Sequence, residues 1–259
     1  MKLKFFQIDT FSNELFKGNP AAVIPLKNWL PTKTMQSIAQ ENNLSETAFF
    51  CRKDSCFEIR WFTPYREVDL CGHGTLAAAF VLFEILRYDL EKIIFKSRTD
   101  ILSVQKDGRL FKLDFPSQEP EKCTIPNVIE EALGVQPLAC YFNEDYIIVY
   151  KDEEAVLNIE PNFNKLKKVE TRGIVITAPS KKYDFVSRAF FPKYGIDEDP
   201  VTGSAHTKLI PYWFRQTGKL KFAVKQVSKR GGLLYCEYKE NRVLISGSAV
   251  LYLRGEIEL

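Results

Sequence analysis

The sequence contains little of what a metal centre or a disulfide framework requires. It has two histidines in 259 residues, and its six cysteines are dispersed, with no pair in the CxxC pattern. A multi-histidine metal site and a disulfide scaffold are therefore both excluded, which leaves only a magnesium ion held by carboxylates. We expect reduced thiols and predict no metal ligands.

The sequence also has little excess charge of either sign and no long apolar run. The 36 Lys and Arg residues exceed the 33 Asp and Glu residues by only 3, and lysines are scattered among acids, so no nucleic-acid-binding surface is predicted. No apolar run approaches membrane-spanning length, and the N-terminus lacks the apolar region of a signal peptide. We expect a cytoplasmic protein with no nucleic-acid or membrane partner.

The composition is otherwise that of a folded globular protein. Hydrophobic residues make up 45% of the chain and charged residues 27%, values that exclude a disordered or fibrous class. A chain of this length can form one large domain or two of ordinary size.

One motif organises the first half of the chain. Residues 69–75, DLCGHGT, continue without a break into the apolar residues 76–83. A helix that is apolar all round is typical of a core, and its first turn carries unpaired N–H groups and partial positive charge. Because Gly72 and Gly74 leave those groups accessible, we predict that Gly72, Gly74 and Thr75 bind an anion.

A second helix start of the same kind occurs at residues 199–206, DPVTGSAH. Upstream of it, residues 188–192 (RAFFP) match residues 60–64 (RWFTP) at Arg, Phe and Pro. The arginine precedes the helix-start glycine by 14 positions in the first half and by 15 in the second, so one inserted residue aligns Gly74 with Gly203. The match predicts an internal duplication, in which each half forms a strand, a loop and a buried helix. The alternative is a chance likeness between two glycine-containing helix starts.

Both halves mix helix and strand, and the proline-bracketed residues 116–120 are the predicted linker. The predicted domains are residues 1–115 and 116–248, with residues 249–259 as a strand that could complete the first. Helices besides the buried one are predicted at 31–40, 126–133 and 203–214. Strands are predicted at 3–9, 21–26, 56–63, 92–95, 138–142, 146–150, 173–178, 185–191, 220–224, 233–237, 242–246 and 249–253. Asn42 and Asn43 are predicted to end the first helix, and a further apolar strand is predicted directly after Glu46, which would lie at the strand entrance.

Four motifs together resemble the phenazine-biosynthesis isomerase family, the PhzF-like proteins. They lie at residues 8–23, 43–49 (NLSETAF), 62–75 and 199–206, in the family's order, and they cover nearly the full length. The resemblance implies the α+β fold of diaminopimelate epimerase, with two pseudo-symmetric domains. Each domain would be a mixed or antiparallel sheet wrapped around a central helix, and the active site would lie in the cleft between them.

The resemblance also implies a cofactor-independent isomerase that acts on a small anionic metabolite and forms a homodimer. The family's general acid and base, the glutamate of its NLSET-type motif, corresponds to Glu46. The histidine of the CGH motif corresponds to His73, and the aspartate, glycine and serine of the DPxTGS motif to Asp199, Gly203 and Ser204. The family's best-known reaction isomerises a dihydro-hydroxyanthranilate by moving a proton along a conjugated ring.

The chemistry of these residues fits such a reaction, because moving a proton between carbons needs one group that accepts it and returns it. Each residue also has a structural interpretation. Glu46 would be a solvated loop carboxylate, His73 a helix cap and Asp199 a helix-start residue. His206 lies inside the second helix, and we predict a structural role for it.

Cys71 raises a separate question, since epimerases and racemases of this fold use two cysteine thiolates, one from each half. The matching region of the second half has no thiol, so we predict that Cys71 is a small buried residue. An amino-acid epimerase or racemase using Cys71 is the alternative enzyme, and a hydrolase pairing Cys71 with His73 is a weaker one. A non-catalytic metabolite-binding protein is the third alternative. The sequence departs from the family at Gly74, where alanine is frequent.

Overall fold

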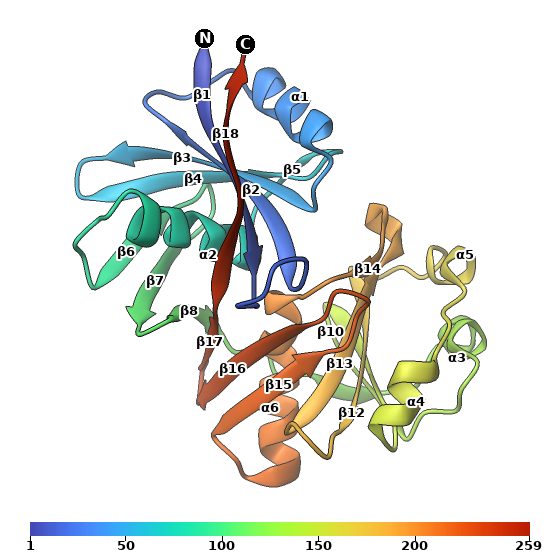
Figure 1. Cartoon of the computed structure of the whole chain (residues 1–259). Helices are drawn as coiled ribbons and strands as arrows, with labels where there is room; N and C mark the ends of the chain where they lie inside the picture. Colours follow the sequence, from blue (N-terminus) through green and yellow to red (C-terminus); the bar gives the residue numbers. More distant parts are fainter. The chain divides into compact units, whose positions relative to one another are not determined.

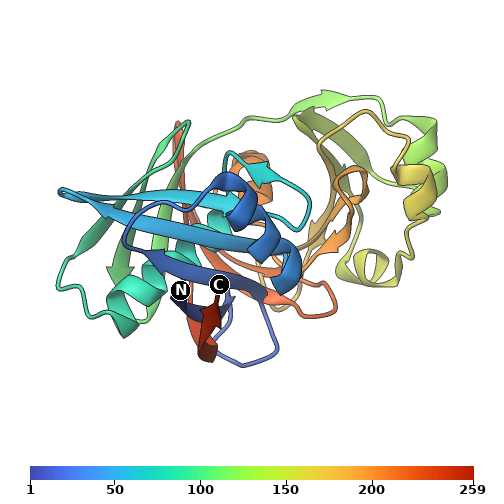
Figure 2. The ribbon, with the colours of Figure 1, turned by 90° about the horizontal axis from the view of Figure 1, so that it is seen from above.

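The computed structural model describes residues 1–259, which form two compact units. The first unit comprises residues 1–114 and 246–259, and the second comprises residues 115–245. The C-terminal strand β18 (Ala249–Glu258) joins the first unit because it pairs antiparallel with β1 (Lys2–Thr10) along its length, so the two chain ends lie side by side (Figures 1 and 2). None of the helices has the length and apolar character that a membrane span requires.

The first unit is a mixed sheet that surrounds one helix. Strand β2 is parallel to β3, β3 is antiparallel to β4, and β4 is parallel to β6, from which β7 and β8 continue antiparallel. The elements after β1 are β2 (Asn19–Leu26), α1 (Thr32–Asn42), β3 (Glu46–Lys53), β4 (Cys56–Phe62), β5 (Glu67–Val68), α2 (Gly72–Phe80), the π-helical turn η1 (Val81–Ile85), β6 (Lys92–Lys96), β7 (Ile101–Asp107) and β8 (Leu110–Pro116).

Helix α2 is the predicted buried helix, and the structure confirms its burial. Residues 76–79 are fully buried, and the helix contacts β1, β2, β3, β7 and β18. The small alanine side chains let strands approach the helix closely on several sides. Because these residues do not meet water, the sequence needs no polar face there. The first turn of α2 is consequently fixed within the core of its unit.

The second unit repeats this order of pairings. Strand β11 is parallel to β12, β12 is antiparallel to β13, β13 is parallel to β15, and β15 is antiparallel to β16. Its elements are β9 (Glu121–Cys123), α3 (Asn127–Leu133), β10 (Ala139–Asn143), β11 (Asp145–Val149), α4 (Glu153–Asn158), α5 (Phe163–Leu166), β12 (Gly173–Pro179), β13 (Phe185–Phe191), the 3₁₀ turn η2 (Pro192–Tyr194), β14 (Ile196–Asp199), α6 (Gly203–Thr217), β15 (Lys221–Gln226), β16 (Gly232–Lys239) and β17 (Arg242–Gly247).

The arginine and phenylalanine that match between the halves have the same role in both units. Arg60 donates from Nε and Nη2 to the carboxylate of Glu67 at 2.8 and 2.7 Å, and its guanidinium lies 5.2 Å above the Phe62 ring. Arg188 likewise donates to Glu198 at 2.7 and 3.0 Å and lies 5.2 Å above its own phenylalanine, two residues on. The matched pairs support the predicted duplication.

Helix α6 runs three residues beyond its predicted end and passes through Pro211. Because proline has no N–H, the carbonyl of Thr207 cannot accept the usual helical bond from it. The backbone N–H of Gln118 donates to that carbonyl instead, at 3.0 Å, and the Thr207 hydroxyl donates to the Gln118 side chain at 2.6 Å. The predicted linker segment is thereby fastened to α6.

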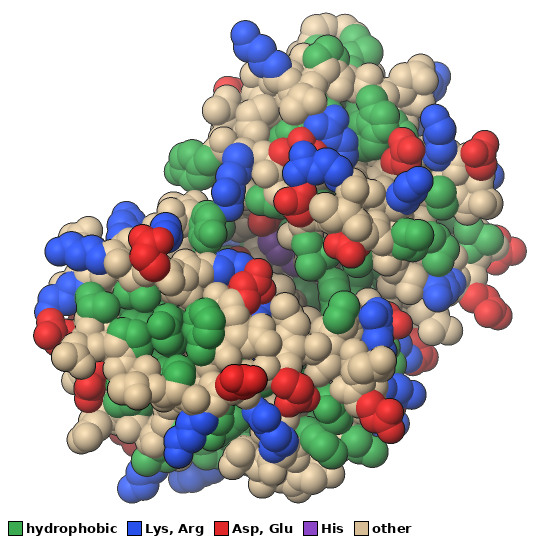
Figure 3. Space-filling model, turned by 180° about the vertical axis from the view of Figure 1, so that it is seen from behind, with side chains coloured by type: hydrophobic (Ala, Val, Ile, Leu, Met, Phe, Trp, Pro, Cys, Tyr) green, Lys and Arg blue, Asp and Glu red, His purple; other side chains and the backbone are tan.

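Charged side chains of both signs are mixed on the face of the molecule that Figure 3 shows. The arrangement agrees with the scatter of lysines and acids along the sequence. Short elements such as β5, β9, β14 and α5 were not predicted, because two to four residues carry no periodic pattern.

Gly173, the first residue of β12, is predicted to tolerate no side chain. A Cβ atom there would lie 2.3 Å from Cε1 of the buried Phe191. We expect Gly173→Ala to lower the free energy of unfolding by about 1–3 kcal/mol, the usual effect of overpacking, measured by denaturant titration. Gly255→Ala in β18 is the matched control, since its Cβ would meet only Leu253 at 3.8 Å. Equal effects of the two changes would contradict the packing explanation.

Candidate functional site

Glu46 lies at the first position of β3, where the chain returns to the sheet after α1. The helix ends at Asn43, whose left-handed backbone (φ 47°) is characteristic of a helix end and whose N–H donates to the Ala39 carbonyl at 3.1 Å. Three residues later the strand begins and pairs with β2, so that Glu46 is opposite Ala21. The predicted placement of Glu46 at a strand entrance is confirmed.

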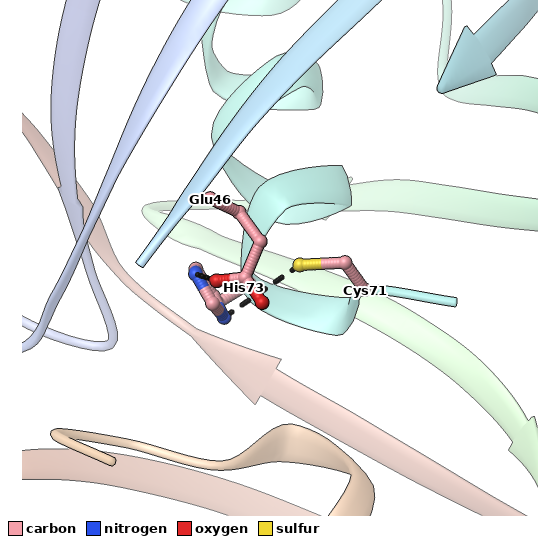
Figure 4. Close-up of side chains that lie close together, drawn as sticks. All are labelled: Glu46, Cys71 and His73. Carbon is pink, nitrogen blue, oxygen red and sulfur yellow. Dashed lines mark hydrogen bonds and ion pairs between the residues drawn. The ribbon is translucent and has the colours of Figure 1, made fainter. Parts of the chain in front are cut away.

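Glu46 and His73 meet in the first unit. Oε2 of Glu46 lies 2.8 Å from Nε2 of His73, and the two side chains are only 13% and 7% exposed (Figure 4). Neither of these two atoms has a hydrogen bond of good geometry. Glu46 is therefore a largely buried group beside an imidazole, and the alternative of a solvated loop carboxylate is wrong.

The other ring nitrogen of His73 faces two further side chains. Nδ1 is 3.7 Å from Sγ of Cys71 and 3.4 Å from Nδ2 of Asn19, which is fully buried in β2. Asn19 was missed as a site residue, although it belongs to the FKGNPAAV motif on which the family resemblance rests. Both contacts are made by the same ring nitrogen, so Asn19 and Cys71 together hold the imidazole at Nδ1 while Nε2 faces Glu46.

The charges in this group affect each other. Burial disfavours the charged imidazolium, but the neighbouring negative charges of Cys71 and Glu46 favour it, and the balance raises the pKa of His73 well above its ordinary value. Burial, followed by the charge of Glu46, raises the pKa of the Cys71 thiol. The closest charged neighbour of the imidazole is the Glu46 carboxylate, whose Oε2 lies 2.8 Å from Nε2.

Cys71 is the N-cap of α2. Its backbone is extended, its Sγ accepts the Gly74 N–H at 3.2 Å, and its carbonyl accepts the Thr75 hydroxyl at 2.6 Å. A Cβ at Gly74 would lie 2.9 Å from that Sγ and 3.0 Å from Cδ1 of Trp61, so glycine is required here for packing. The donors of Gly74 and Thr75 are used within the helix start, and anion binding by Gly72, Gly74 and Thr75 stays a prediction.

Asp199 lies in the second unit, at the end of β14 and not within a helix. It is 7% exposed, and its Oδ2 accepts the Thr202 hydroxyl. The buried side chain of Gln226 clamps this segment, since it donates to the Asp199 carbonyl at 2.8 Å and accepts the Thr202 N–H at 2.8 Å. Gln226 was missed because no motif surrounds it.

Ser204, in the first turn of α6, is held by a buried network of charges. Nη1 of Arg172 donates to the Ser204 hydroxyl at 3.2 Å, while Nε of Arg172 donates to Asp145 at 2.9 Å. Asp145 and Lys208 are fully buried, and Nζ of Lys208 lies 3.2 Å from carboxylate oxygens of both Asp145 and Glu144. No side chain caps the first turn of α6, which begins at Gly203.

His206 is structural, as its position inside α6 predicted. It is fully buried, its Nδ1 lies 2.8 Å from the Thr202 carbonyl and donates to it, and its ring stacks on Phe185. Burial lowers its pKa to about 4, so that it is uncharged in the folded protein at neutral pH.

The structure thus groups the predicted residues by unit. Glu46 and His73 lie together in the first unit with Cys71, and each of these three offers one donor atom that could ligate a metal, all within 4.8 Å of one another. Asp199, Gly203 and Ser204 lie together at the start of α6 in the second unit.

Comparison with known proteins gives consistent results. The phenazine biosynthesis-like protein family matches residues 8–255. An uncharacterized isomerase of Pseudomonas aeruginosa is 46% identical over 259 residues, 100% of both chains. A PhzF family crystal structure from Enterococcus faecalis has a TM-score of 0.98 at 48% identity, covering 100% of both chains. A predicted epimerase from Pseudomonas aeruginosa shares the fold, with a TM-score of 0.72 at 20% identity over 98% of this chain and 99% of that one. The expected α+β, diaminopimelate epimerase-like fold is confirmed.

The buried His206 is predicted to make stability depend on pH. The unfolded chain takes up a proton on this residue below about pH 6.5, whereas the folded chain does so only near pH 4. The free energy of unfolding should therefore fall as the pH drops from 6.5 to 4, with up to about 3 kcal/mol from this residue. Thermal melts should show a shallower decline for His206→Gln; identical slopes would contradict the assignment.

Proposed function

Because the chain belongs to the phenazine biosynthesis-like protein family and is an isomerase, we propose that it moves a proton between two carbons of a small carboxylated metabolite, without a cofactor. The observation that carries the proposal is the buried contact of Glu46 with His73, 2.8 Å between Oε2 and Nε2. A carboxylate with few contacts to water, beside a group that can be positively charged, is suited to general acid and base chemistry.

In the proposed reaction Glu46 first acts as the base. Its carboxylate takes a proton from a carbon of the metabolite, and the electron pair left behind is delocalised through the adjacent double bond into the metabolite's carboxylate. The protonated Glu46 then returns the proton to a different carbon of the same conjugated system. One residue serves both steps, so no proton acceptor other than Glu46 is needed.

His73 supports both steps through its charge. The pKa of His73 is raised well above its ordinary value by the neighbouring charges of Cys71 and Glu46, which favours the imidazolium beside Glu46. Its positive charge stabilises the negative charge that develops on the metabolite while the proton is on Glu46. Asn19 and the capped start of α2 hold the ring in place, because Nδ1 contacts Asn19 and Cys71.

The second unit would supply the binding site for the metabolite's anionic group. The first turn of α6 has no side-chain cap, so its N–H groups from Gly203 onward suit an anion. Arg172 donates to the Ser204 oxygen, which directs the hydroxyl hydrogen of Ser204 away from the guanidinium. Ser204 is thereby oriented as a donor to the metabolite, and Asp199 beside it would hold or relay a proton.

An amino-acid epimerase that uses Cys71 is the second candidate, favoured by the 3.7 Å contact between Sγ and Nδ1 of His73. Two observations weigh against it. Burial raises the pKa of this thiol, and its sulfur accepts the Gly74 N–H as a helix cap. Cys71→Ser should therefore leave proton transfer intact in the leading proposal and abolish it in this one. The expected homodimer and the cytoplasmic location stay predictions.

We predict that Glu46→Gln abolishes catalysis and leaves the fold unchanged. Metabolites that raise the melting temperature would be incubated with the enzyme in deuterated water, and deuterium at carbon would be followed by proton NMR. Loss of the base should lower the exchange rate by at least about 100-fold. Glu41→Gln, on the exposed end of α1, is the matched control and should exchange like the wild type. Undiminished exchange by Glu46→Gln would remove the proposed base, and stabilisation without any exchange would indicate a non-catalytic binder.

Arg172→Lys should weaken substrate binding more than it slows turnover. Lysine keeps the charge beside Asp145 but cannot donate to the aspartate and to Ser204 together in the same fork geometry. Steady-state kinetics with a substrate found in the screen should show a KM raised about 10-fold, corresponding to one lost hydrogen bond to a charged group, with kcat little changed. Ser204→Ala should show the same pattern; unchanged KM in both variants would rule out this binding site.

A further inference from the structure

The side chains of Glu46, Cys71 and His73 form a cluster with the donor types that zinc prefers. One carboxylate, one thiol and one imidazole each present a donor atom, and the three atoms lie within 4.8 Å of one another. Thiolate and imidazole ligands select zinc and similar transition metals, whereas magnesium and calcium prefer oxygen ligands. Glu46 lies 25 positions before Cys71 in the sequence, so ligand spacing in the sequence does not reveal the cluster.

The distances around His73 match a tetrahedral centre. With Zn–S of about 2.3 Å and Zn–N of about 2.0–2.1 Å, a tetrahedral ion separates sulfur from nitrogen by about 3.6 Å. Sγ of Cys71 and Nδ1 of His73 are 3.7 Å apart. Both residues are fixed by the buried start of α2, one as its N-cap and the other in its first turn. Two of the ligand positions are therefore already at the required separation.

Glu46 supplies a third ligand. Its side chain reaches the imidazole from the start of β3, as Figure 4 shows, and one of its carboxylate oxygens lies within 4.8 Å of the donor atoms of Cys71 and His73. A buried carboxylate needs a neighbouring positive charge, and a bound cation would supply that charge in place of the imidazolium. Three protein ligands leave the fourth tetrahedral position for water.

We propose that the Glu46–Cys71–His73 cluster binds one Zn²⁺ through Sγ of Cys71, Nδ1 of His73 and one carboxylate oxygen of Glu46, with water as the fourth ligand. Binding replaces the contact of Nδ1 with Asn19 and releases two protons to solvent, one from the thiol of Cys71 and one from Nδ1 of the imidazolium. The ion occupies the carboxylate that acts as base and fixes the imidazole, so zinc reversibly inhibits the enzyme. This inhibitory effect rests on the proposed function, whereas the binding itself does not.

A cobalt titration tests the site without any substrate. The full chain, reduced and freed of metal by a chelator, is titrated with Co²⁺ and followed by absorption spectroscopy. We expect one equivalent to produce a thiolate-to-cobalt charge-transfer band in the near ultraviolet together with the visible bands of a tetrahedral ion. Zn²⁺ should abolish both by displacement, since it binds such ligands more tightly than Co²⁺. No charge-transfer band with several equivalents of Co²⁺ would overturn the proposal.

Cys71→Ser is the decisive variant. Serine is a favourable N-cap, so α2 should be retained, which a circular dichroism melt would verify. The variant should lose the charge-transfer band and bind Co²⁺ at least about 100-fold more weakly, because loss of a ligand exceeds the 10–100-fold cost of altering its surroundings. His73→Gln is the second variant and should weaken binding similarly. A band that persists in either variant at wild-type affinity would refute the assignment.

Cys140→Ser is the matched control. Cys123 and Cys140 face each other across β9 and β10 with their sulfurs 3.4 Å apart, so this pair of thiols is a second place where a metal could bind. The control should keep the band and the wild-type affinity. If the band disappears in Cys140→Ser and survives in Cys71→Ser, the metal binds to the strand pair and the proposal is wrong.

The two proposals fail in distinguishable ways. If Co²⁺ binds through Cys71 but Glu46→Gln exchanges deuterium like the wild type, the isomerase mechanism is wrong and the metal site stands. If exchange requires Glu46 but Co²⁺ gives no band, the metal site is wrong and the mechanism stands. When both hold, one equivalent of Zn²⁺ should stop exchange, and a chelator should restore it.

Discussion

The buried contact between the Glu46 carboxylate and the His73 imidazole is the interaction on which the rest of the site depends. Removing a carboxylate from water is costly, and the cost is tolerable only when a partner of opposite charge lies close by. The raised pKa of His73 favours its imidazolium form, and this positive charge lies beside the carboxylate. Each element around the pair serves to hold it: β3 begins at the glutamate, and α2 begins beside the histidine.

The two units show how one scaffold carries different chemistry. Both use a parallel and antiparallel set of strands around a buried helix, and both fix the loop before that helix with an arginine bound to a glutamate. At the helix start, the first unit has a thiol, an imidazole and a carboxylate. The second has Asp199 held by Gln226, and Ser204 held by Arg172. The two units thus differ in the residues at their helix starts and not in the scaffold that carries them.

Local patterns in the sequence were sufficient for the parts of the structure that local forces determine. The uninterrupted apolar run after Gly74 predicted a buried helix, and Asn43 followed by an apolar strand predicted where Glu46 would enter the sheet. The matched Arg and Phe positions predicted the repeat. These signals hold because burial and turn conformation act within a few residues of one another.

Contacts between distant residues were beyond the reach of such patterns. Asn19 meets His73 across 54 positions, and Gln226 meets Thr202 across 24. Cys71 was predicted to be a small buried residue, which it is, yet its sulfur also caps α2 and faces the imidazole. No spacing rule anticipates a partner that tertiary packing brings into contact.

The coupling between Glu46 and His73 can be measured directly by NMR titration of the histidine ring nitrogens in metal-free protein. With only two histidines in the chain, the spectrum of His206→Gln assigns both. We predict that His73 titrates well above the ordinary histidine range in the wild type and that its pKa falls in Glu46→Gln, because burial then acts against a weaker opposing charge. The same pKa in both proteins would contradict the account.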